Sequence, residues 1–311
     1  MEKRPFIIDC DTGTDDAIAV MAALGCEDID VKAITSVNGN VQEEWTSANN
    51  RNLTEYLGIP VEVARGAVLP FYPRGDYYGD THGRTGLGDV VIPTAEHSEF
   101  SKDRAPEVIR RIAAGEGGAL ELLVIGPMTN IAIALSLYPE LAGEIRHIWV
   151  MGGAVRGGNV NTTAEFNIWV DPYAAAMVFR AGIPLTMVGL DVTEQAILNA
   201  EDEKRYRALG TRAGVLTADI LQYMFQRNQK GGEDAMMHDA LALAAAVCPQ
   251  CLEFKPYFVD VECQGAYTAG HTAVDVRGVS GRKPNAMVAT DLKLDRFKEW
   301  LFRCIEGCGR S

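Results

Sequence analysis

Long hydrophobic runs and an excess of basic residues are both missing from this sequence of 311 residues. Its longest apolar stretch, residues 240–248, is far shorter than the roughly 20 residues that a membrane-spanning helix requires, so we predict no membrane association. The chain has 29 Lys and Arg residues against 42 Asp and Glu residues, a formal net charge of −13. Because a protein that follows nucleic-acid phosphates needs the opposite balance, we also predict no nucleic-acid partner. A neutral ligand, a cationic ligand or a metal cation is favoured instead.

Cysteine is scarce as well, with 7 residues scattered over the chain. An odd number at such spacing is typical of reduced thiols and not of a disulfide framework. The first apolar run, residues 6–8, ends at Asp9 and is too short for a secretory signal, so we expect a cytoplasmic protein. Cys248 and Cys251 have the spacing of a redox centre or half of a zinc site. The other interpretation is a pair of buried cysteines with neither role.

Linkers rich in proline or serine, internal repeats and low-complexity tracts are also absent, so we expect a single domain over residues 1–311. Short apolar or β-branched segments alternate with segments of helical pattern. This alternation predicts an α/β fold with a mostly parallel, Rossmann-like central sheet flanked by helices. Strands are predicted at residues 6–8, 31–37, 61–64, 120–125, 147–151 and 185–188, and helices at 43–57, 130–138, 171–181 and 292–304.

Four aspartates follow the first predicted strand within eight residues: Asp9, Asp11, Asp15 and Asp16. Ligands of such sheets bind where loops gather at the carboxyl ends of the strands, so we expect the active site there. A helix-capping turn with solvated acids would explain one or two of these residues. A bound cation explains all of them, because unpaired carboxylates this close together repel one another. Carboxylate oxygens are hard ligands, which select Ca²⁺ or Mg²⁺ over zinc.

The segment DCDTGTDDA, residues 9–17, resembles the signature of the inosine-uridine-preferring nucleoside hydrolase family. The resemblance implies an N-glycosidase of nucleoside catabolism that holds Ca²⁺ and hydrolyses ribonucleosides to ribose and free base. Relatives are usually dimers or tetramers, which implies a homodimer or homotetramer here. The resemblance spans at least residues 6–240 through further motifs in the family's order: Val37-Asn-Gly-Asn40, His82-Gly83, Gly126-Pro-Met-Thr-Asn130, Met151-Gly-Gly153, Gly158-Asn159, Ala164-Glu-Phe-Asn167 and His238-Asp239.

The family's calcium ligands correspond to the carboxylates of Asp11, Asp16 and Asp239 and to the main-chain carbonyl of Ile125. The resemblance implies that the ion acidifies a water molecule and that Asp11 is its general base. This water attacks the anomeric carbon while the sugar becomes oxocarbenium-like, a state that an acidic pocket stabilises. The family's substrate-binding residues, mostly contacts to the ribose hydroxyls and the 5′ end, correspond to Asp15, Asn40, Asn159, Glu165, Phe166 and Asn167.

The departing base needs a proton or a hydrogen bond, and two histidines match family positions near it. His238 would act as the acid toward the leaving group, and His82 would contact the base. A structural interpretation stays open for each, as a helix cap for His238 and an exposed loop residue for His82. Gln226, on a predicted helix, matches a glutamine of pyrimidine-preferring relatives and slightly favours uridine and cytidine over inosine.

Two other functions remain as alternatives. The pattern Asp9-x-Asp11-x-Gly13-Thr14 after an apolar strand resembles the nucleophile motif of haloacid-dehalogenase-type phosphatases, although that class leaves the later motifs unexplained. A nucleoside-binding protein without turnover is the third interpretation. Release of ribose from uridine or inosine separates the hydrolase from the binding protein, and release of phosphate from a phosphomonoester would indicate the phosphatase.

Overall fold

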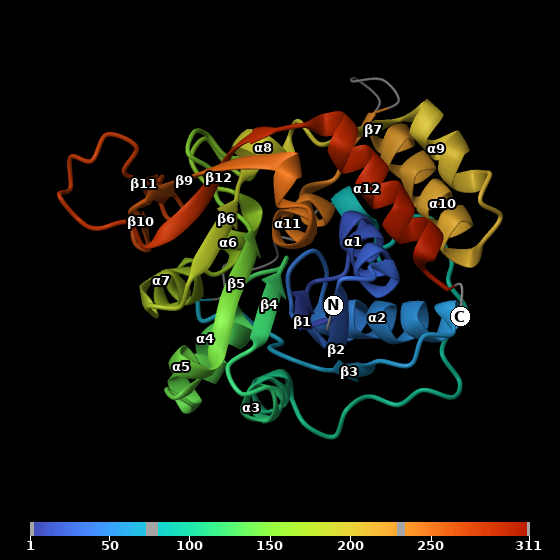
Figure 1. Cartoon of the computed structure of the whole chain (residues 1–311), viewed down its shortest axis with the longest axis horizontal. Coiled ribbons are helices and arrows are strands. Elements are labelled where there is room, and N and C mark those ends of the chain that lie inside the picture. The colour runs from blue at the N-terminus through green and yellow to red at the C-terminus, as the bar shows by residue number, and fades with distance from the viewer. Residues whose placement is uncertain (1–2, 73–79, 229–233, 310–311) are drawn as a thin grey trace.

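The computed structural model describes residues 3–72, 80–228 and 234–309 (Figure 1). Its centre is one eight-stranded sheet, and every neighbouring pair of strands in it is parallel except β12 with β9. The predicted α/β fold with a mostly parallel sheet is therefore confirmed. The strands lie in the order β3 (Glu62–Ala64), β2 (Ile29–Ser36), β1 (Arg4–Cys10), β4 (Leu120–Val124), β5 (Ile145–Met151), β6 (Leu185–Val188), β12 (Ala286–Leu292) and β9 (Leu252–Tyr257).

The central strands are apolar along most of their length because helices cover both faces of the sheet. Every residue of β4, LELLV, is buried, whereas most residues of the edge strand β9 are at least partly exposed. The one acid of β4, Glu121, is tolerated inside because it accepts hydrogen bonds from Arg4 Nε at 2.9 Å and from Trp149 Nε1 at 2.7 Å.

Two layers of helices sandwich the sheet, as Figure 1 shows. One layer contains α3 (Ala105–Gly115), α4 (Thr129–Leu137), α5 (Leu141–Glu144) and α7 (Pro172–Arg180). The other contains α1 (Thr14–Gly25), α9 (Ala200–Arg207), α10 (Arg212–Arg227), α11 (His238–Val247) and α12 (Leu294–Gly307). The helix α2 (Glu43–Leu57) packs beside β2 and β3. The predicted helices thus match α2, α4, α7 and α12 to within a few residues.

Short elements complete the chain. The strand β7 (Ile197–Asn199) pairs antiparallel with β8 (Asp234–Met236), and β10 (Val259–Val261) pairs with β11 (Thr272–Val274). The remaining helical turns are η1 (Asp80–His82), α6 (Phe166–Val170), α8 (Leu190–Thr193) and η2 (Pro249–Cys251). In the described part of the chain, every helix is too short or too polar to span a bilayer.

One pair departs from the reduced thiols expected of scattered cysteines, and it is the pair whose spacing is that of a redox centre or half of a zinc site. Cys248 and Cys251 form a disulfide, because η2 follows α11 directly and folds the second cysteine back toward the first. Both side chains are buried. The other cysteines, Cys10, Cys26, Cys263, Cys304 and Cys308, are free thiols.

Candidate active site

The aspartates predicted to bind a cation gather at the carboxyl end of β1. Asp11 lies in the loop after this strand, and Asp15 and Asp16 lie in the first turn of α1. The main-chain N–H of Gly13 donates to Asp16 Oδ2 at 2.9 Å, which fixes that carboxylate at the helix start. Asp239 joins them from the first turn of α11. Both helices present their N-termini here, and the positive end of a helix dipole favours carboxylates.

These carboxyl groups are buried and in mutual contact. Asp15, Asp16 and Asp239 each offer an oxygen within 4.8 Å of the others, and Asp16 also contacts Asp11. Burial and then the charge of Asp15 raise the pKa of Asp16 to about 7. Burial is also the main cause that raises the pKa of Asp11 and of Asp239, followed by the neighbouring aspartates. Without a cation, the cluster is therefore unfavourable when its carboxyl groups are ionised.

The donor set of this cluster fits a hard divalent cation. Asp11 Oδ1 and Asp16 Oδ1 are buried without any hydrogen-bond donor, a costly state that a cation would relieve. Only glycine fits at position 126, because a Cβ atom of Gly126 would lie 2.8 Å from Asp11 Oδ1. Ile125 follows β4 at the same edge and is one of the residues that line the cavity. Oxygen ligands of this kind fit Ca²⁺ or Mg²⁺ better than zinc.

The loop after β2 orients the aspartates. The main-chain N–H of Asn40 donates to Asp11 Oδ2 at 2.7 Å, and its side-chain Nδ2 donates to Asp16 Oδ2 at 3.0 Å. One residue therefore holds two of the carboxylates from outside the sequence motif that contains them. The other oxygen of each carboxylate, Oδ1, is buried and accepts no hydrogen bond.

The loop after β5 brings two further predicted residues to the site. The Glu165 carboxylate caps α6, accepting from the N–H groups of Asn167 at 2.9 Å and Ile168 at 3.2 Å, and it also accepts from Gly153 at 2.9 Å. Burial raises the pKa of Glu165 to about 7 despite these bonds. Asn167 Nδ2 donates to the Ile125 carbonyl at 2.9 Å, which ties this loop to the predicted metal ligand.

A cavity of about 460 Å³ opens over the acidic cluster, within the size range of small-molecule sites. Asp11 and Asp16 lie buried at its floor and are not exposed on its wall. Asn159 Oδ1 accepts from the Phe166 N–H at 2.9 Å, so these two predicted residues are coupled in the cavity wall. The structure brings together on this wall Asp15, Asn40, His82, Ile125, Asn159, Glu165, Phe166, Asn167, His238 and Asp239.

We call the part of the cavity around His82, His238 and Arg227 the histidine end. His82 is partly buried, and its Nδ1 lies 3.1 Å from the main-chain N–H of Thr14, which can only donate. Nδ1 is therefore the acceptor, and Nε2 carries the proton. Burial lowers the pKa of His82 to about 4, which keeps the ring neutral. His238 Nδ1 lies 2.8 Å from Thr193 Oγ1, so α8 orients that ring.

Gln226 is not at this end, so its predicted contact with the base does not agree with the structure. It is exposed and lines a different surface hollow together with Gln222 and Tyr223. Successive helix residues are about 100° apart, and the turn of α10 that faces the cavity carries Met224 and Arg227. Sequence reasoning missed Arg227, and the signal that could have found it is a basic residue in the last turn of a helix ahead of His238.

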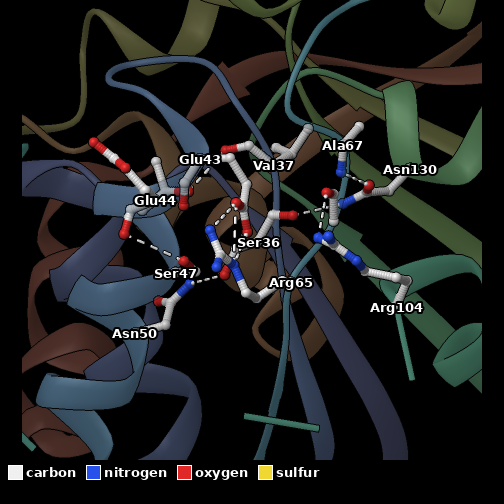
Figure 2. A network of polar contacts seen from close by, with 12 residues as sticks. Ser36, Val37, Glu43, Glu44, Ser47, Asn50, Arg65, Ala67, Arg104 and Asn130 are labelled. Carbon is white, nitrogen blue, oxygen red and sulfur yellow. Dashed lines mark hydrogen bonds and ion pairs between the residues drawn. The ribbon is translucent and has the colours of Figure 1, made fainter. Parts of the chain in front are cut away.

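A buried network behind the site joins the ends of three strands (Figure 2). Asn130, at the start of α4, donates through Nδ2 to Asp9 Oδ1 at 2.7 Å and to the Ser36 carbonyl at 2.9 Å. Its Oδ1 accepts from the Ala67 N–H at 2.8 Å. Asp9 is thus a structural member of the acidic motif that fastens β1 to its neighbours and does not line the cavity.

Replacement of Asn130 by alanine should lower the free energy of unfolding by about 1–3 kcal/mol, because Asp9 and Ala67 lose buried partners. Urea unfolding measures the change. Ser136→Ala on the exposed side of the same helix is the matched control and should stay within about 0.5 kcal/mol of the wild type. Equal stability of the two variants would contradict the role given to Asn130.

The family model described as inosine-uridine preferring nucleoside hydrolase matches residues 6–299. The chain belongs to this family. It is an N-glycosidase of EC class 3.2.2 that hydrolyses ribonucleosides, as the sequence motifs predicted.

Several known proteins align with this nucleoside hydrolase over almost its whole length. It is 38% identical over 301 residues to the pyrimidine-specific ribonucleoside hydrolase RihA of Escherichia coli O9:H4 (strain HS), covering 96% of each chain. The purine-preferring ribonucleoside hydrolase from Gardnerella vaginalis is 35% identical, with a TM-score of 0.92 and 99% of each chain covered. The plant nucleoside hydrolase PpNRh1 is 26% identical, with a TM-score of 0.91 and coverage of 98% and 99%. The first two names point to opposite bases, and the pyrimidine-specific relative has the slightly higher identity.

Proposed function

We propose that this nucleoside hydrolase is Ca²⁺-dependent and cleaves ribonucleosides with Asp11 as general base. The observation that supports this most is the pair of buried oxygens, Asp11 Oδ1 and Asp16 Oδ1, that have no donor beneath the cavity. Asp11, Asp16, Asp239 and the Ile125 carbonyl would hold the cation. When bound, Ca²⁺ supplies Lewis acidity that lowers the pKa of a water molecule. The metal site therefore lies where the sugar must bind.

The chain's own residues account for the remaining steps. Asp11 takes the proton of the attacking water, and the surrounding carboxylates stabilise the positive charge that develops on the sugar. Asp15, Asn40, Glu165 and Asn167 bind the ribose hydroxyls, with Asn159 and Phe166 toward the 5′ end. The base lies at the histidine end, where His82 donates through Nε2 and His238 protonates the leaving group.

We further propose that uridine and cytidine are slightly favoured over inosine, and that the protein is a cytoplasmic homodimer or homotetramer. Support for the base preference comes from the relative named pyrimidine-specific, at 38% identity, and no longer from Gln226. None of the similar proteins named above is a phosphatase or a binding protein without turnover, so nothing favours those alternatives.

The decisive experiment measures the release of free sugar: ribose from uridine, cytidine, inosine and adenosine, and 2-deoxyribose from their 2′-deoxy forms. We expect turnover of the ribonucleosides and kcat/KM values at least about 10²-fold lower for the 2′-deoxy forms, because polar groups built for a hydroxyl would be left unpaired. Release of no ribose from any ribonucleoside would refute the proposal. Similar rates for uridine and 2′-deoxyuridine would refute the hydroxyl contacts.

A further inference from the structure

Arg227 is the last residue of α10, and its side chain lines the histidine end of the cavity. The position suits a cation, because the carboxyl end of a helix dipole is negative. Its Nη1 donates to the main-chain carbonyl of Thr81, the residue before His82. Among the described residues that line this cavity, Arg227 is the only Arg or Lys.

Arg227 lies beside His82 in this cavity, which His238 also lines. Burial is the largest cause that lowers the pKa of His82, and the charges of Arg227 and His238 lower it further, against the opposing charge of Asp15. The position of Arg227 beside His82 thus stands on its hydrogen bond to Thr81, and the effect of its charge agrees with that position.

Cleavage creates opposite charges at the two ends of the substrate. When the N-glycosidic bond breaks, its electron pair stays on the base nitrogen and the sugar becomes cationic. Asp15, Glu165 and Asp239 suit the sugar but oppose the negative charge on the base. The base thus needs positive charge at its own end of the cavity. In the complete reaction, water supplies hydroxyl to the anomeric carbon and a proton to the base.

We propose that Arg227 contacts the departing base and stabilises its negative charge while the glycosidic bond breaks. This inference rests on the proposed function. Arg227 neither gives nor takes a proton, and its N–H groups bind the acceptor atoms of the base, which are carbonyl oxygens and unprotonated ring nitrogens. Electrostatic stabilisation by a fixed donor is effective here because the group is already in place before the reaction.

The test compares two leaving groups in the variant Arg227→Gln, which removes the charge. With uridine, whose base is a poor leaving group, kcat should fall about 10²-fold. With 4-nitrophenyl β-D-ribofuranoside, whose nitrophenolate needs little stabilisation, kcat should fall by less than about 5-fold. Arg227→Lys, which keeps the charge, should have a kcat for uridine about 10-fold higher than that of Arg227→Gln.

Gln226→Ala is the matched control, because Gln226 is the neighbouring exposed residue on the same helix but lines the other hollow. Both of its rates should remain within about 2-fold of the wild type. Equal losses on uridine and the arylriboside in Arg227→Gln would overturn the inference, since Arg227 would then only position the Thr81–His82 segment. Unchanged uridine activity would also overturn it. A wild-type enzyme that cleaves neither substrate would instead refute the proposed function itself.

Discussion

Replacing Asp11 with alanine should lower kcat/KM for uridine by at least about 10⁴-fold, because one change removes both the proposed general base and a metal ligand. The rate of ribose release with uridine as the only substrate measures the effect. Asp295→Ala removes an equal charge from the first turn of α12, where the carboxylate is exposed. This control should retain activity within about 2-fold of the wild type.

The thermal stability of the same variants separates loss of chemistry from loss of fold. Asp11 is buried against Asp16, so its removal relieves repulsion in the metal-free protein. Metal-free Asp11→Ala should therefore melt at or above the temperature of metal-free wild type. If Asp11→Ala kept about a tenth or more of the wild-type activity, this result would exclude Asp11 as the base.

Chelation of divalent cations should abolish ribose release and also destabilise the protein. A ligand present at about 100 times its Kd stabilises the native state by about 2.7 kcal/mol, and its removal reverses this gain. The loss should be visible here because Asp11, Asp16 and Asp239 are buried together. Melting curves and ribose release before and after chelation measure both effects.

Metal restoration identifies the ion. Ca²⁺ should restore both activity and melting temperature after the chelator is removed, whereas Zn²⁺ should not, because the donors are hard oxygens. Restoration of both activity and melting temperature indicates a cation in the active site, since a cation that only crosslinks the surface would leave activity unaltered. Full activity after exhaustive chelation, or better restoration by Zn²⁺ than by Ca²⁺, would contradict the proposed cofactor.

The acidic motif was readable from the sequence because its members are close together in the chain. Asp11, Asp15 and Asp16 follow a short apolar strand, and a strand followed by a helix already places them at one edge of a sheet. Asp239 and Ile125 were reachable only through the family resemblance. A carbonyl carries no side-chain signal, and the structure places Ile125 among the residues that line the cavity.

The histidine end shows where sequence reasoning stops. Gln226 and Arg227 are adjacent, and a helical pattern does not say which of them turns toward the cavity. The packing of α10 against α1, α9 and α12 sets its rotation, which places Arg227 at the cavity and Gln226 at another hollow. The spacing of Cys248 and Cys251 left a redox centre, half of a zinc site or neither role open, because spacing alone does not fix the backbone path through η2 that brings the two together.

The sequence by itself determined the family, the alternating strands and helices, and the residues of the acidic cluster, since local pattern and short motifs encode these features. Tertiary structure decided which carboxylate oxygens lack donors, which nitrogen of His82 carries the proton, and that Arg227 lines the same cavity as both histidines. These properties depend on groups brought together from distant strands and helices. Burial and electrostatic interactions act through space, so their effects are set only when the chain has folded.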